Sequence, residues 1–131
     1  MAVFATAIGL APSRAEARDD VPDEVSQRPN PVSLEESELR YYARQFKGKC
    51  ARCHGADGTG GSEPVEPPRV APRDFTDAGY MATRTDGQLF YQILMGGGDR
   101  CAMPAFGPES DHAWNEDKIW HMVAFVRRFA R

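Results

Sequence analysis

The sequence predicts an all-α domain. Three segments have the apolar spacing of amphipathic helices, and each begins near residues that can cap a helix. The connecting segments are rich in glycine and proline, and no stretch alternates apolar and polar residues as a half-buried strand does. The 131 residues suit one domain. A domain of this size buries about 65% of its unfolded surface, so a bulky apolar cofactor would help to fill its core.

The composition is that of an ordinary globular protein and excludes several classes of function. Apolar residues make up 41% and charged residues 27% of the chain, which lacks the low hydrophobicity of disordered proteins. The net charge is -3, and no basic stripe of the kind that binds nucleic acid is present. No stretch approaches the roughly 20 apolar residues of a membrane-spanning helix. We expect neither nucleic-acid binding nor a membrane span in the mature chain.

Residues 1–17 have the pattern of a signal peptide. An apolar run over residues 2–11 has the length of a signal-peptide core, Pro12 interrupts it, and residues 15–17 (AEA) form a small-x-small cleavage pattern. The basic n-region is missing or truncated, because the first basic residue is Arg14. We therefore expect export with cleavage after residue 17, and a plain apolar tail is the alternative.

Residues 18–32 are expected to form a flexible acidic linker outside the core, because they contain three prolines and almost no apolar periodicity. The folded domain is expected over residues 33–131. Its first helix is predicted to begin at Ser33, whose side chain can form a capping box with Glu36. The apolar face of this helix leads into a cysteine motif and consists of Leu39, Tyr42, Ala43, Phe46 and Cys50.

A long loop and two further helices follow. Residues 55–84 contain too many glycines and prolines for long regular elements, and we expect a wrapping loop there. The second helix is predicted to start at a capping box of Thr85 and Gln88 and to stop at the three glycines of residues 96–98. The last helix is predicted to begin near Asn115, with acids in its first turn and arginines in its last. Its apolar face consists of Ile119, Trp120, Val123 and Val126.

The motif of residues 50–54, CARCH, has three possible chemistries. A redox Cys-x-x-Cys of the thioredoxin kind needs a preceding strand and a βαβ frame, whereas a helix precedes this motif. A zinc site would use Cys50, Cys53, His54 and Cys101. A histidine directly after the second cysteine is crowded for tetrahedral coordination, and no second pair of ligands exists. The zinc and dithiol interpretations are therefore weak.

The third chemistry is covalent haem attachment, which has this spacing. Positions i and i+3 of a helical turn face the same side, so Cys50 and Cys53 can both form thioether bonds to one porphyrin. His54, at i+4, is then held under the ring, where its imidazole can bind iron as the proximal ligand. A motif of five residues can occur by chance, so the rest of the chain has to support it.

The second half of the chain supplies that support, because Met103 lies directly before a proline in the loop after the glycine helix stop. From residue 33 to residue 131 the chain resembles the class I cytochrome c family. In that family an N-terminal helix enters CxxCH, a Met-Pro loop carries the distal iron ligand, and a C-terminal helix crosses the first. The resemblance implies a class I cytochrome c fold whose loops wrap one covalently bound haem c. It implies thioethers at Cys50 and Cys53, His54 as proximal ligand and Met103 as distal ligand.

The resemblance also implies roles for neighbouring residues. Phe46 matches the family's aromatic residue at the helix crossing, with Trp120 and Val123 on the partner helix. Tyr42 occupies the place of the family's small residue, which implies a shifted or wider crossing. A backbone carbonyl in residues 66–68 is the expected acceptor for the second ring nitrogen of His54. The residues expected around the haem without binding iron are Pro67, Pro68, Tyr80 and Phe106.

The remaining sulfur and imidazole side chains are expected to pack or to lie at the surface, and not to bind iron. Cys101 lies two residues before Met103, and its expected role is that of a small half-buried residue. Its alternatives are competition with Met103 for iron or an intermolecular disulfide. The other side chains of this group are Met81, Met95, Met122, His112 and His121.

The expected function is that of an electron carrier and not of an enzyme. A methionine ligand raises the reduction potential relative to a second imidazole, and two strong axial ligands leave no open site at iron. The resemblance implies a periplasmic location and redox partners, such as a respiratory complex, an oxidase or the catalytic subunit of a dehydrogenase or reductase. Three classes stay open: a free shuttle, a docked haem subunit of a dehydrogenase or reductase, and a haem sensor or peroxidase-like protein in which Met103 leaves iron.

Overall fold

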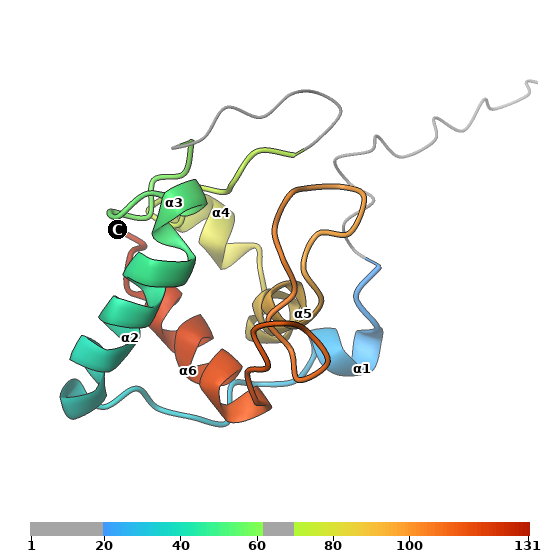
Figure 1. Cartoon of the computed structure of the whole chain (residues 1–131), viewed down its shortest axis with the longest axis horizontal. Coiled ribbons are helices and arrows are strands. Elements are labelled where there is room, and N and C mark those ends of the chain that lie inside the picture. Colours follow the sequence, from blue (N-terminus) through green and yellow to red (C-terminus); the bar gives the residue numbers. More distant parts are fainter. Residues whose placement is uncertain (1–19, 62–69) are drawn as a thin grey trace, which may run out of the picture.

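The structure, a computed structural model, describes residues 20–61 and 70–131 (Figure 1). Within these ranges it contains helices and no strand, which confirms the all-α prediction. The expected signal peptide lies outside the described residues. None of the helices in the described part of the chain is both long and apolar enough to cross a membrane. The helices are α1 (Asp23–Ser26), α2 (Glu36–Lys49), α3 (Ala51–His54), α4 (Ala78–Ala82), α5 (Asp86–Met95) and α6 (Glu116–Arg127).

The first long helix, α2, begins later than predicted. Its N-cap is Glu35, whose side chain accepts from the N–H of Glu38, while the Glu35 N–H donates to Glu38 Oε2 over 3.0 Å. The predicted box of Ser33 and Glu36 does not form, because the backbone stays extended through Glu35 (φ -77°, ψ 152°). Carboxylates in this turn also suit the positive end of the helix dipole. The predicted starts of α5 at Thr85 and of α6 at Asn115 are confirmed.

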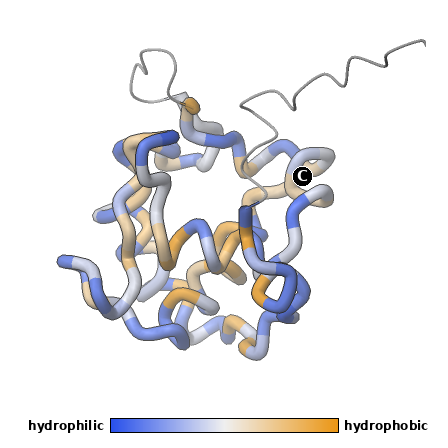
Figure 2. Tube along the Cα trace, turned by 90° about the vertical axis from the view of Figure 1, so that its right-hand side faces the viewer, coloured by the Kyte–Doolittle hydropathy of each residue, from blue (hydrophilic) through white to orange (hydrophobic). Residues whose placement is uncertain are grey.

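Helix α6 packs against both α2 and α5 and forms the centre of the fold (Figure 1). At the crossing with α2, Phe46 contacts the rings of Phe125 and Phe129 at centroid distances of 5.6 and 5.0 Å. The predicted apolar face of α6 is buried in full. Figure 2 shows the apolar segments gathered toward the middle of the molecule and the hydrophilic segments around them.

Trp120 was expected at the crossing with α2, but its ring stacks on Phe90 of α5 at a centroid distance of 4.1 Å. His121 faces α2 in its place, because its ring stacks on Tyr42 at 5.1 Å. Consecutive residues of a helix are turned by about 100°, so one of these two side chains points to each neighbouring helix. Trp120 therefore joins α6 to α5.

The expected wrapping loop of residues 55–84 contains a short helix, α4. Its N-cap is Asp77, whose Oδ1 accepts from the N–H of Tyr80 over 2.9 Å. Arg127 of α6 donates to the carbonyl of Met81 over 2.6 Å and ties α4 to the core. The capping aspartate was a signal for this helix, but five residues are too few for periodicity to be recognised.

Residues 20–32, here called the N-terminal strap, do not lie apart from the core as the linker interpretation expected. Helix α1 of the strap packs on α5. Thr85 Oγ1 donates to the carbonyl of Ser26 over 2.6 Å, and Asn30 Nδ2 donates to the carbonyl of Trp120 over 3.0 Å. Besides these polar contacts, only Val25 and Val32 of the strap are apolar side chains that pack against the core. Two such residues are too few for the apolar periodicity that predicts a packed element.

Candidate functional site

The predicted site residues line one cavity of about 390 Å³. Cys50, Cys53 and His54 come from the end of α2 and from α3, and Met103 comes from the loop between α5 and α6. The fold therefore brings together side chains that are about fifty positions apart in the chain. Tyr80, Phe106 and Cys101 also line this cavity.

The cysteine side of the cavity is built from a short break between two helices. The Cys50 backbone (φ -120°, ψ -36°) leaves helical geometry after α2, and the chain then turns into α3. The N–H of His54 donates to the Cys50 carbonyl over 2.9 Å, which keeps the motif in one helical turn. Burial, and then the charge of Cys53, raise the pKa of the Cys50 thiol to about 12. This environment does not favour the thiolate that dithiol redox chemistry needs.

The imidazole of His54 is held from two sides. Its Nδ1 lies 3.3 Å from the carbonyl oxygen of Arg73, and the ring of Phe75 stacks on it at a centroid distance of 4.4 Å. Burial lowers the pKa of His54, and the hydrogen bond to the Arg73 carbonyl opposes this in part. The neutral imidazole that results is the form that binds metal, and the contact of Nδ1 leaves Nε2 for that role.

Among the described residues, the acceptor at His54 lies later in the loop than the predicted segment. Arg73 takes this role, whereas residues 66–68, including Pro67 and Pro68, lie outside the described residues. Sequence reasoning missed Arg73 because any residue can offer a backbone carbonyl. A close turn places it, since the N–H of Gly60 donates to the His54 carbonyl over 2.7 Å. A Cβ on Gly60 (φ 76°) would lie 2.7 Å from the Pro72 carbonyl oxygen.

The methionine side of the cavity is held by hydrogen bonds to α5 and to the start of its loop. The N–H of Gly97 donates to the Met103 carbonyl over 2.9 Å. Gln92 Nε2 donates to the Gly96 carbonyl over 2.9 Å and lies 3.7 Å from Met103 Sδ. Gln92 was not among the predicted residues; its position on the cavity side of α5, one turn before Gly96, is the signal that could have found it.

Cys101 is half-buried, as expected for a packed residue. Its Sγ lies so close to the backbone of Gly97 that a Cβ there would overlap it. Within residues 20–61 and 70–131, no group of three or more His, Cys, Asp or Glu side chains could hold a metal ion, so the zinc set with Cys101 is not assembled.

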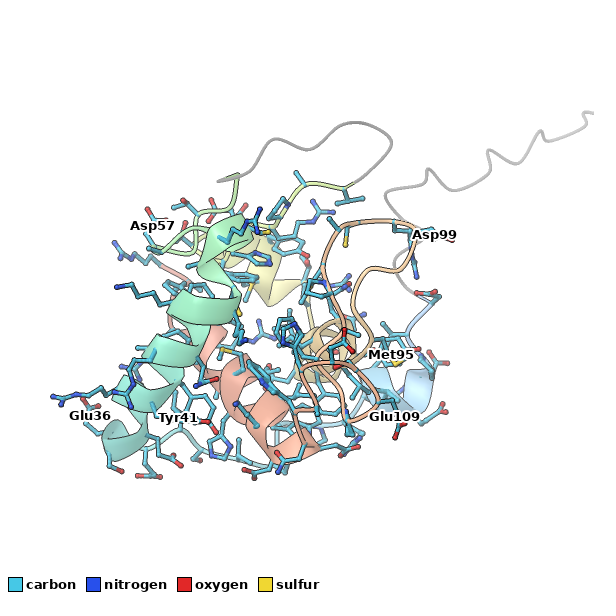
Figure 3. The ribbon with its side chains drawn as sticks, in the orientation of Figure 1. Glu36, Tyr41, Asp57, Met95, Asp99 and Glu109 are labelled. Carbon is cyan, nitrogen blue, oxygen red and sulfur yellow. The ribbon has the colours of Figure 1, made fainter. Side chains whose placement is uncertain are left out.

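The other methionines and histidines divide into buried and exposed positions. Met81 and Met122 are buried in the core, as expected. Met95, labelled in Figure 3, was expected to pack, but it is 54% exposed. It is the last residue of α5, directly before the glycine stop. His121 is buried with Nδ1 2.8 Å from the Asp117 carbonyl, and His112 stacks on Phe106 at 4.3 Å.

One polar atom at the cavity has no partner. Among the described residues, Arg73 Nε is a buried side-chain nitrogen without a hydrogen bond, and its guanidinium lies 5.2 Å from the centroid of the Tyr80 ring. A buried guanidinium nitrogen next to a cavity is suited to an anionic group such as a carboxylate. The cavity thus offers two thiols, an imidazole and a thioether, which are ligands suited to iron and covalent porphyrin chemistry, together with a donor for a carboxylate.

Comparisons with known proteins agree with this chemistry. The family model described as cytochrome c oxidase, cbb3-type, subunit III matches residues 38–126. The structure of the KustC0563 c-type cytochrome is similar with a TM-score of 0.54 and 24% identity; the match covers 68% of this chain and 96% of that one. No curated protein matches the chain.

A second similar structure is the Kuenenia stuttgartiensis reducing HAO-like protein complex Kustc0457/Kustc0458. It has a TM-score of 0.57 and 18% identity, and the match covers 77% of this chain. The chain spans 47% of that longer protein. At these identities the two structural likenesses concern the fold.

Proposed function

The chain belongs to the family of cytochrome c oxidase, cbb3-type, subunit III, and is a class I c-type cytochrome that transfers electrons through covalently bound haem c; on this premise we propose which residues hold the haem. Cys50 and Cys53 would form the thioether bonds, and His54 and Met103 would hold the iron of a single haem. The observation that carries this proposal is the common cavity, which all four side chains line.

The residues of the cavity fit the haem in two further respects. Aromatic and aliphatic side chains supply an apolar lining, among them Phe46, Phe75 and Leu89. Arg73 Nε, the buried donor without a partner, is suited to a carboxylate of the porphyrin. Haem c bound here supplies one-electron Fe(III)/Fe(II) chemistry.

The chain's own residues then favour a carrier over a sensor or a peroxidase. The Arg73 carbonyl orients the imidazole of His54. Gly97 and Gln92 restrain Met103 at its carbonyl and its sulfur. A restrained methionine keeps exogenous ligands from iron, and a rigid site suits electron transfer. We therefore propose that the protein is not itself an enzyme.

A docked subunit is the second candidate function. The matching family is described as an oxidase subunit, and one of the similar structures is a protein complex. Redox proteins are thus the proposed partners, either a respiratory complex or oxidase, or the catalytic subunit of a dehydrogenase or reductase. The proposed location is the periplasm, in agreement with the signal-peptide pattern of residues 1–17. Co-purification with a catalytic subunit would separate this candidate from a free shuttle.

The surface beside the cysteines suggests how a partner is recognised. Although the chain has a net charge of -3, no acidic residue lies between residues 39 and 56. Lys49 is exposed and lines the cavity beside the cysteines. Such a local positive potential favours an acidic surface on the partner. The other exposed cations that contribute to this potential are Arg40, Arg44 and Lys47.

A pyridine haemochrome spectrum of protein made together with a haem-attachment system tests the attachment. We expect one haem per chain with two thioether bonds. Cys50→Ala and Cys53→Ala should each leave one thioether, whereas Cys101→Ala should leave two. A spectrum of non-covalent haem, or a loss of thioether in Cys101→Ala, would contradict the assignment.

A further inference from the structure

The N-terminal strap contacts the loop that carries Met103. Asp20 Oδ2 lies 2.6 Å from Arg100 Nη2 at the tip of this loop. Asp20 and Val21 also line a small second cavity together with Gln92, Gly96 and Gly97. The strap therefore lies against the residues that hold the Met103 carbonyl and sulfur.

Arg100 is the point at which three segments meet. Its side chain pairs with Asp20 of the strap, and its N–H donates to the Gly97 carbonyl over 3.0 Å. Its own carbonyl accepts from the N–H of Val70, also over 3.0 Å. Gly97 in turn donates to the Met103 carbonyl. Two backbone hydrogen bonds therefore connect Arg100 to Met103.

The other end of the strap is fixed to the body of the domain. A Cβ on Gly87 of α5 would overlap the Val25 carbonyl oxygen, so the backbone of α1 lies directly on α5. The guanidinium of Arg28 lies 5.3 and 5.2 Å from the ring centroids of Phe90 and Trp120. The same side chain pairs with Glu116 over 3.2 Å. Because α1 and Arg28 are anchored in this way, Asp20 at the other end of the strap can restrain the loop that carries Met103.

We propose that the N-terminal strap positions Met103. By holding Arg100, the strap keeps the loop of residues 96–107 closed over the cavity. It thereby slows the displacement of the Met103 sulfur from iron by other ligands. This inference rests on the proposed function, in which Met103 binds iron. It gives residues 20–28 a role at the site, although none of them lines the cavity that holds the proposed ligands.

Gly87→Ala in the full-length holoprotein tests the anchor. The new methyl group should lift α1 from α5 and raise the rate at which imidazole displaces Met103 from the ferric protein by about tenfold, an effect within the range of single substitutions. Gly48→Ala on α2 is the control, because nothing lies within 4 Å of its Cβ position. It should leave the rate unchanged.

Asp20→Asn tests the contact with the loop. Unlike Gly87→Ala, it adds no atoms at a close-packed position. We expect imidazole to displace Met103 about two to five times faster, which is the size of effect expected for an exposed ion pair. The difference from the unmodified protein should be smaller at high salt. Hydrogen exchange of the Gly97 and Val70 amides should accelerate as well, with or without ligand. Asp23→Asn makes the same charge change in the strap and should have no effect.

The outcomes separate the two proposals. If Gly87→Ala and Asp20→Asn leave both displacement and amide exchange at the values of their controls, the positioning role is wrong. If Met103→Ala shows that methionine is not the ligand, the ligand assignment fails. Amide exchange at Gly97 still decides in that case whether the strap restrains the loop.

Discussion

The two sides of the cavity are built in different ways. On one side, Cys50, Cys53 and His54 lie within a single helical turn that follows directly from α2. On the other side, Met103 lies in a loop without regular structure and is held through Gln92, Gly97 and Arg100. One side therefore depends on local geometry, and the other on contacts between segments far apart in the chain.

Because of this difference, one side of the cavity determines whether the haem site forms, and the other determines its ligand exchange and reduction potential. Local geometry forms whenever the helix forms, so damage to the cysteine and histidine side should prevent a stable site. A loop held by several weak contacts can open while the rest stays folded, since local stability is not uniform in a protein. Changes on the methionine side should thus alter ligand exchange and potential while the haem stays attached.

The largest effect is expected for His54→Ala. Without the imidazole, the proximal ligand is lost, and we expect no stable holoprotein. The haem content per chain after purification measures this. His112→Ala, which changes a histidine that stacks on Phe106, should keep the full haem content. Full haem content in His54→Ala would place the proximal ligand elsewhere.

Gly96→Ala should open the methionine side alone. The residue has φ 68°, and its Cβ would lie 2.6 Å from the Ala105 nitrogen and 2.7 Å from the Met103 carbonyl oxygen. We expect the haem to be retained and the near-infrared methionine-to-iron absorption band to be weaker. The free energy of unfolding should be lower by about 1–3 kcal/mol. Gly98→Ala is the matched control, because it has φ 55° in the same loop and nothing lies within 4 Å. Equal effects on the band in both variants would show that backbone strain alone acts.

The two edges of the cavity also differ in charge. Lys49 lies at the cysteine edge, whereas the exposed residues Ala102 and Pro104 at the methionine edge are uncharged. Lys49→Glu should slow oxidation by anionic ferricyanide and speed reduction by cationic hexaammineruthenium(II), and salt should reduce both effects. Stopped-flow kinetics measure the rates. Unchanged rates with both reagents would mean that electrons do not pass through this edge.

The smallest effect is expected at the α2–α6 crossing, which supports both sides. Burial, and then the charges of Asp117, Tyr41 and Glu38, raise the pKa of Tyr42 to about 12. The folded state therefore keeps its proton between pH 10 and pH 12 while the unfolded state loses it, so stability falls as the pH rises through this window. Tyr42→Phe should lack this fall. Between pH 8 and pH 11 its free energy of unfolding should therefore decrease by roughly 1 kcal/mol less than that of the unmodified protein.

Denaturant unfolding at pH 8 and pH 11 measures the effect of Tyr42→Phe. Tyr41→Phe serves as the control, because that side chain is 40% exposed and its loss leaves the burial of Tyr42, the largest cause of the shift, in place. The same pH dependence in Tyr42→Phe and in the unmodified protein would show that another group is responsible.

The same contrast explains what could be predicted from the sequence. The turn with the thiols and His54, and the caps at Thr85 and Asn115, depend on neighbours within four residues and could be predicted. Met103 was assigned by family resemblance, because no local rule marks a ligand in an irregular loop. Arg73 and the strap depend on backbone groups that distant segments bring together, and these carry no pattern in the sequence. Even the cap of α2 was displaced from Ser33 to Glu35, since both positions offer a similar spacing of acceptors.

The absorption spectrum of oxidised Met103→Ala, compared with that of Met95→Ala, tests whether Met103 binds the haem iron. Met95 is the matched control, because it is an exposed methionine outside the cavity. We expect Met103→Ala to lose the near-infrared methionine-to-iron band, to keep its covalent haem, to have a lower reduction potential and to bind carbon monoxide when reduced. Met95→Ala should retain the band. An unchanged band and potential in Met103→Ala would contradict the two-sided site described above.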